Sequence, residues 1–343
     1  MSTDLPSFSF DPPPVTETLP QACSIGSFWR RLFAFAVDGI ILGIFGTILG
    51  GVFFDTFSQL GPYGKLVGFL IAVPYFAVME SSIGGGQSLG KRLLSLRVVD
   101  AQGKTLPFEQ SFLRYTVFSA PLFLNRLALP MTKTSWIISI LLGVIVFGVG
   151  GVTLYLMIFN RNTRQGLHDL AVGSYVVWAG NIGPVESKSM WKNHWAVVGF
   201  LLVTFTTTLA VLNYKMEKWD RFPQLLQDVR LIEQIDDVQN VTAQEPRLLN
   251  RSGDRTRKVL IVDITCARNP TNREAYVDQA VKIILQNDPR VQEYDVLSIG
   301  ITRSYDIGIA SGWISQRFGH SPAEWNQLLF GVSPAPVSTQ TQQ

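Results

Sequence analysis

The stretch FWRRLFAFAVDGIILGIFGTILGGVFF, residues 28–54, is typical of a membrane-spanning helix that begins with two arginines and contains one carboxylate. No charged residue interrupts the apolar run between Asp38 and Phe54. Asp38 follows Arg31 by seven residues, about two helical turns, so the two side chains share one helix face. A carboxylate within hydrocarbon costs roughly 2.5–3.5 kcal/mol on insertion scales. Asp38 is therefore expected to face protein, water or a cation, with Arg30 or Arg31 as its partner.

The composition of the chain favours a membrane protein with a modest soluble part. Hydrophobic residues make up 47% of the 343 residues and charged residues only 16%, and the net charge of +3 is too small to suggest a nucleic-acid partner. Cys23 and Cys266 are far apart and belong to no metal-ligand pattern, so neither a metal nor a cofactor is expected. The first residues lack the three-part pattern of a cleavable secretory signal.

Other apolar stretches extend the membrane region. Three of them are predicted to span the membrane: residues 66–79, 135–159 and 195–212. A fourth stretch, residues 112–130, contains Arg114 and Arg126 and is either a short third span or an interfacial segment. Residues 55–65 are expected to form the loop between the first two spans. The predicted fold is therefore an all-α polytopic membrane bundle of about four to five transmembrane helices, followed by a small C-terminal α/β domain.

Two features of the first two spans bear on how the bundle packs. The glycines of the first span come in pairs four residues apart, Gly39 with Gly43 and Gly46 with Gly50, which is the spacing that lets another helix approach closely. Glu80 lies near the end of the second span. It is expected either to pair with Arg30 or Arg31 across the bundle or to remain solvated at the level of the headgroups.

A glycine-rich and basic segment, GGGQSLGKRLLSLRVVD, occupies residues 84–100. A phosphate-binding loop is excluded, because the first glycine of that motif is absent and Arg92 stands where Ser or Thr should bind magnesium. We expect instead a juxtamembrane segment in which Lys91, Arg92 and Arg97 contact anionic lipid headgroups. The leucines at positions 93, 94 and 96 are expected to dip into the membrane interface.

Three separate motifs, in order, resemble the RDD family of membrane proteins, which is named for one arginine and two aspartates. The motifs are Arg30-Arg31 with Asp38, the segment 86–100 followed by Arg114, and RQGLHDLAVGSYVV at 164–177. The resemblance covers residues 25–180. By position it implies that the family arginine is Arg30 or Arg31 and that the aspartates are Asp38 and Asp169, with Asp100 the weaker candidate for the second. Ser174 stands where the family commonly has Thr. The function that the resemblance implies is transport, including cation/proton exchange for some members.

The charges near the ends of the spans predict the topology. Segments 84–114 and 160–194 are basic, so both are expected on the cytoplasmic side of a cell membrane together with the N-terminus. This requires 112–130 to cross, and it places everything after residue 214 outside the cytoplasm. The expected domains are a disordered cytoplasmic tail at 1–24, the RDD-like region at 25–180, a linker and last span at 181–214, an extracytoplasmic α/β domain at 215–330 and a disordered tail at 331–343.

The C-terminal domain is predicted from a β-α-β-β pattern. Residues 258–266 form an apolar strand, residues 271–286 a helix capped by Asn269 or Thr271, and residues 294–302 and 305–314 two strands that turn at 303–304. A helix at 216–237 is expected to leave the membrane, and residues 240–257 are polar. Asp263, Cys266 and His320 belong to no catalytic or metal-binding pattern, so no enzyme is predicted.

The sequence suggests two candidate sites and two candidate functions. Asp38 with Arg30, Arg31 and Glu80 is either part of a transport route or a structural group that fixes helix packing. His168 with Asp169 is either a cytoplasmic proton site or a helix cap. The first function is transport of a small cation or solute by a homo-oligomer. The alternative is a membrane scaffold whose domain at 215–330 binds a protein partner. Membrane lipids are the expected contacts in both cases.

Overall fold

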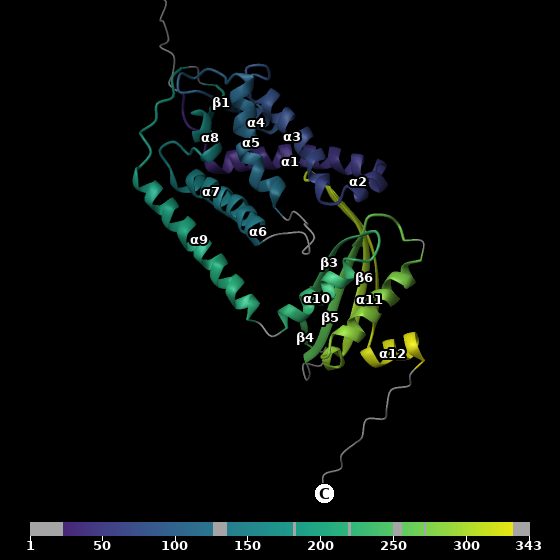
Figure 1. The fold of residues 1–343 in the computed structure, drawn as a ribbon. Helices are drawn as coiled ribbons and strands as arrows, with labels where there is room; N and C mark the ends of the chain where they lie inside the picture. Colours follow the sequence, from purple (N-terminus) through teal and green to yellow (C-terminus); the bar gives the residue numbers. More distant parts are fainter. Residues whose placement is uncertain are drawn as a thin grey trace, which may run out of the picture.

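The computed structural model describes residues 23–125, 136–180, 183–218, 221–249, 256–270 and 272–331. The tails at 1–24 and 331–343, which were expected to be disordered, lie almost wholly outside these ranges. Apolar helices occupy most of the first two thirds of the chain, and a sheet with covering helices follows (Figure 1). The predicted fold class, a helical membrane bundle with a small α/β domain, is confirmed.

Four helices within the described ranges are long and apolar enough to cross a membrane: Phe28–Val52, Phe54–Met79, Ile140–Phe159 and Asn193–Leu212. The first is α1 (Phe28–Val52), and the fourth lies within α9 (Asn193–Glu217). The third combines α6 (Trp136–Gly143), a π-helical segment η2 (Val144–Val149) and α7 (Gly150–Phe159).

The second membrane helix begins earlier than predicted. It combines α2 (Phe54–Leu60), a 3-10 turn (Gly61–Tyr63) and α3 (Gly64–Met79). The loop predicted at 55–65 is therefore wrong. Gly61, with φ +51° and ψ −126°, ends α2, and Pro62 follows at an early position of the next turn, where its missing N–H costs nothing.

The stretch with the two arginines forms α5 (Phe108–Leu124), which packs along α3 and against η2 and α8. Arg114 is buried on its inner face. The part of the predicted span beyond Asn125, including Arg126, lies outside the described residues.

The two basic segments meet at one end of the bundle. β1 (Leu96–Val99) pairs antiparallel with β2 (Tyr175–Trp178), and Ile25 bridges to Val177 beside them. The short helices α4 (Leu89–Leu93) and α8 (Leu167–Val172) flank this ribbon. The prediction that both segments lie on one side of the bundle agrees with this pairing.

The C-terminal domain is a mixed sheet packed against three helices. Its strands are β3 (Val238–Gln244), β4 (Arg247–Leu249), β5 (Thr256–Cys266), β6 (Val296–Asp306) and β7 (Ser311–His320). The order is β3-β5-β6-β7, β4 pairs with β5, and only the β5–β6 pair is parallel. The core forms between the sheet and α10 (Phe222–Ile232), α11 (Arg273–Asn287) and α12 (Pro322–Phe330), with a 3-10 turn at Val291–Glu293.

The β-α-β-β pattern is confirmed as β5-α11-β6-β7, but several boundaries differ. The hairpin turns at 307–310 rather than 303–304, because Gly308 adopts the left-handed conformation (φ +80°) that the turn requires. Asn272 caps α11 instead of Asn269 or Thr271. The helix predicted at 216–237 is two helices, α9 and α10, and the polar stretch at 240–257 contains β3 and β4.

The hairpin formed by β6 and β7 joins the two parts of the molecule. It extends from the α/β domain to α1, α2 and α3 (Figure 1). Ile307 is fully buried, and Ile309 packs into the apolar core of the membrane bundle with Leu42 and Phe123. Three of the four paired glycines of α1, Gly43, Gly46 and Gly50, therefore face a β-hairpin and not the helix that their spacing predicted, while Gly39 has no neighbour within 4 Å.

Candidate functional site

A buried cluster of charged side chains lies where α1, α3, α5 and α8 converge near the β1–β2 ribbon. We call it the Arg114 cluster; its members are Arg31, Glu80, Lys91, Arg114, His168 and Asp169. The six side chains come from five separate parts of the sequence, since His168 and Asp169 are adjacent. The cluster is therefore a product of the tertiary fold.

Arg114 lies at the centre of this cluster because its planar guanidinium reaches two carboxylates at once. Its Nη2 donates to Asp169 Oδ1 at 2.7 Å and its Nε to the same oxygen at 2.9 Å. Its Nη1 donates to Glu80, which also accepts from the ammonium group of Lys91. Ser174 Oγ lies 3.1 Å from both Arg114 Nε and Asp169 Oδ1, so its hydroxyl accepts from the arginine and donates to the aspartate.

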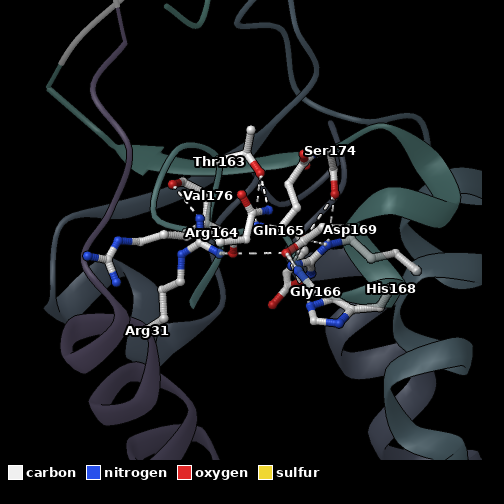
Figure 2. A network of polar contacts seen from close by, with 12 residues as sticks. Arg31, Thr163, Arg164, Gln165, Gly166, His168, Asp169, Ser174 and Val176 are labelled. Atoms are coloured by element: carbon white, nitrogen blue, oxygen red, sulfur yellow. Dashed lines mark hydrogen bonds and ion pairs between the residues drawn. The ribbon is translucent and has the colours of Figure 1, made fainter. Parts of the chain in front are cut away.

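Arg31 joins the cluster from α1 (Figure 2). Its Nη1 lies 3.6 Å from Asp169 Oδ2 and donates to the carbonyl of Arg164 at 2.6 Å. Its Nη2 donates to the carbonyl of Val176 in β2 at 3.0 Å. Arg31 thus ties the first membrane helix to the loop before α8 and to the β1–β2 ribbon.

His168 and Asp169 occupy the first turn of α8. Asp169 Oδ2 accepts from the backbone N–H of Gly166 and caps the helix, while the ring of His168 packs edge-on against Phe118. Burial lowers the pKa of His168 to about 4, so the imidazole is neutral at pH 7. Burial alone would raise the pKa of Asp169, but His168 and the guanidinium groups of Arg114 and Arg31 hold it below the ordinary carboxyl range.

Asp38 belongs to a separate site. Its Oδ1 accepts from the hydroxyl of Tyr75 and the backbone N–H of Gly90, both at 2.8 Å, and its Oδ2 accepts from Ser88 Oγ at 2.5 Å. Ser88 is itself the N-cap of α4 and accepts from the N–H of Lys91. The carboxylate of Asp38 therefore lies at the positive end of α4 and holds that helix against α1.

The expected pairing of Asp38 with Arg30 or Arg31 is thus corrected. Arg31 reaches Asp169 on another helix, and Arg30 lies over the ring of Trp178, 3.9 Å from its centroid, and donates to the carbonyl of Leu94. The expected pairing of Glu80 with these arginines is also wrong, because Glu80 pairs with Arg114 and Lys91.

The basic segment divides between the interior and the surface. Lys91 was expected at the lipid headgroups, but it turns inward to Glu80. Arg92 is exposed and donates to the carbonyl of Gly84, and Arg97 is half-buried on β1. Leu93 is exposed as expected for an interfacial residue, whereas Leu96 is fully buried in the core beneath β1.

A small pocket of about 50 Å³ opens beside the cluster. Arg31, Glu80, Lys91, Arg114 and His168 supply its polar wall, and its apolar wall includes Phe35, Phe76, Tyr115 and Phe118. The ring nitrogen Nδ1 of His168 is buried and has no hydrogen-bond partner among the residues that the structure describes. The pocket holds room for a few water molecules or one small ion.

Sequence reasoning matched Arg114 to a motif of the family but did not identify it as the residue that joins Glu80 to Asp169. The available signal was its position, because an arginine seven residues into α5, beyond the polar first turn and within an apolar stretch, requires buried partners. Tyr75 and Ser88 were also missed as partners of Asp38. Asp100, the weaker candidate for the second family aspartate, lies away from the cluster and caps the turn after β1.

Comparison with known proteins gives one match. The model of the RDD family matches residues 25–173, which contain every member of the Arg114 cluster and Asp38. No curated protein matches the chain. No solved structure matches it either.

Proposed function

Because residues 25–173 belong to the RDD family of membrane proteins, we propose that this integral membrane protein carries a small monovalent cation across the membrane and binds it at Glu80. The proposal retains the transport function expected from the sequence. It moves the binding carboxylate from Asp38 to Glu80, since both oxygens of Asp38 already accept hydrogen bonds from neutral groups.

The observation that carries the proposal is the contact between Lys91 and Glu80 at the wall of the pocket. Lys91 extends from the five-residue helix α4, and its side chain is 13% exposed, against 6% for Arg114 and 4% for Arg31. It is the most accessible cation of the cluster. Its ammonium group occupies the position at Glu80 that a free monovalent cation would take.

Charge balance favours a cation at this position. When a cation displaces Lys91 towards solvent, the charge inside the cluster stays constant, so the buried carboxylates remain neutralised. His168 adds no opposing positive charge at pH 7, because its pKa is lowered to about 4 by burial. A small ion also fits the volume of the pocket.

Passage from the pocket to the other end of the bundle requires movement. The apolar core begins at the pocket wall with Phe76 and Tyr115 and continues to Leu42 and Phe123, and Ile309 of the hairpin packs on that core. In the transport cycle that we propose, the hairpin withdraws from the bundle to open the far end. The proposal assigns no catalytic residue.

The orientation is part of the same proposal. The basic segments that meet at the β1–β2 ribbon would face the cytoplasm, because Lys and Arg near span ends remain on that side. The hairpin end of the bundle and the α/β domain would then lie on the opposite, extracytoplasmic side of the cell membrane. Self-association and a protein partner for residues 215–330 remain predictions.

Uptake of Na⁺, K⁺ or Li⁺ into proteoliposomes containing the purified protein tests the function. We expect uptake by the wild-type protein, loss of uptake in Glu80→Gln and wild-type uptake in Glu109→Gln, since Glu109 is exposed on the first turn of α5. Lys91→Met should lower the half-saturating cation concentration, because it removes the tethered competitor and leaves Arg114 to hold Glu80.

Two outcomes would contradict the proposal. One is the absence of uptake of all three cations by folded wild-type protein. The other is a half-saturating concentration in Lys91→Met that equals the wild-type value, because a purely structural Lys91 does not compete with the cation.

A further inference from the structure

The β6–β7 hairpin enters the membrane bundle to a depth that can be measured along α1. A Cβ atom built on Gly43 would lie 3.6 Å from the carbonyl oxygen of Ile309, and one on Gly46 would lie 2.9 Å from the Cβ of Ala310. Gly43 precedes the end of α1 at Val52 by nine residues, which is about 14 Å of helix. The tip of the hairpin therefore reaches well inside the span of a membrane helix.

Polar contacts mark where the hairpin leaves the bundle. Arg303 pairs with Asp55 at the start of α2, and Gln239 of β3 donates to the carbonyl of Ser58 at 3.0 Å. Charged groups of this kind belong at the level of the headgroups rather than in hydrocarbon. Lys65 of α3 also pairs with Asp306 at 3.3 Å, so charged groups continue along β6 as far as its last residue. The headgroup level therefore crosses β6 at residues 303–306, where the ring of Tyr305 packs edge-on against Phe54.

The strand register shows which residues of β7 lie at this level. Ser304 lies opposite Trp313, and Arg303 lies opposite Ile314. Both side chains on β7 are large and apolar, yet Trp313 is 71% exposed and Ile314 is 53% exposed. Tryptophan is the residue enriched at membrane–water interfaces, where its ring lies at headgroup level.

We propose that Trp313 and Ile314 contact the lipid bilayer, so that the hairpin anchors the α/β domain in the leaflet on that side of the membrane. Lipid is the partner because β7 packs on the α1 span, and Ile48, Val52 and Phe53 are exposed at the same end of that helix. Only the tip can lie deep, since a free strand edge in hydrocarbon leaves backbone groups unsatisfied. Trp313 marks the depth at which β7 returns to the interface.

Labelling at two points of β7 tests this inference. Trp313→Cys and Gly319→Cys lie on the same face of the strand, six residues or about 20 Å apart. A side chain at 319 is accommodated, because its Cβ would meet neighbours no closer than 3.7 Å. Both variants are made in the full chain with the buried Cys23 and Cys266 replaced by Ala, labelled with an environment-sensitive fluorophore, and reconstituted into vesicles of phosphatidylcholine and phosphatidylglycerol.

Lipids that carry a nitroxide quench a label in the bilayer, and iodide ions quench a label in water. We expect lipid-borne nitroxide to quench the label at 313 at least threefold more than the label at 319, and iodide to show the reverse preference. A label at Ile314→Cys should be quenched like the label at 313. This variant keeps Trp313, so it controls for a local effect of losing the tryptophan. Equal quenching at 313 and 319 by both agents would overturn the proposal.

Discussion

Gly68 offers a test of how firmly the hairpin is held in the membrane bundle. It lies on α3 against the tip of the hairpin, where a Cβ atom would overlap the carbonyl oxygen of Ile307 and stand 3.1 Å from the backbone nitrogen of Ile309. Optimal contacts between heavy atoms are about 3.5–4.0 Å, so Gly68→Ala forces the hairpin to retreat by more than about 1 Å. Overpacking of this kind costs about 1–3 kcal/mol.

Amide hydrogen exchange at the hairpin measures this loss of local stability. Because about 1.4 kcal/mol corresponds to a factor of ten, we expect exchange at the N–H of Ile307, which donates to the carbonyl of Ala310, to be about 5- to 150-fold faster in Gly68→Ala. Gly51→Ala is the control, since a Cβ there meets nothing within 4 Å. Unchanged exchange in Gly68→Ala, or equal acceleration in both variants, would refute the reasoning.

Three further predictions concern buried charges. Arg114→Met leaves Glu80 and Asp169 without their shared cation and should lower the free energy of unfolding by about 3–5 kcal/mol. Substitution of an exposed arginine, Arg92→Met, should change it little. Thermal unfolding of both variants in detergent measures the difference. His168 binds its proton more weakly in the folded state, so acidification from pH 7 to pH 4 should cost the wild-type protein up to about 3 kcal/mol more than His168→Gln. Burial and the nearby Asp288 raise the pKa of Asp228 to about 7, so the folded state becomes less stable as the pH rises from about 4, the ordinary carboxyl pKa, to about 7. Asp228→Asn should therefore raise the melting temperature most at pH 8, less at pH 5, and leave it nearly unchanged at pH 3. A larger effect of Asp228→Asn at pH 5 than at pH 8 would contradict this assignment.

Much of the helical framework was predictable because membrane spans are encoded in local composition. The first span, the last two spans and the apolar strand at 258–266 were all found from runs of apolar residues. The extra helix α2 was not, because Asp55, Gly61 and Pro62 resemble a loop when read alone. Their helical state depends on packing of α2 against β6, a strand more than 200 residues away.

The partners of the buried charges were less predictable for the same reason. Helical periodicity placed Arg31 and Asp38 on one face of α1, but it could not show that α4 would bring its N-terminus to Asp38. That approach depends on Gly90, where a Cβ would overlap the carbonyl of Ala34. Likewise, the glycine spacing of α1 indicated a close neighbour but could not distinguish a helix from a strand pair.

The position of the hairpin also constrains how the protein is assembled. The surface that receives it is formed by residues 42–72 and Phe123, all of which are synthesised well before the hairpin, residues 303–314. During synthesis the glycine-lined face of α1 and α3 must remain without its final occupant until α9 has crossed the membrane and the sheet has formed. The bundle is therefore completed from the side of the α/β domain, in a step that joins segments more than 200 residues apart in the sequence.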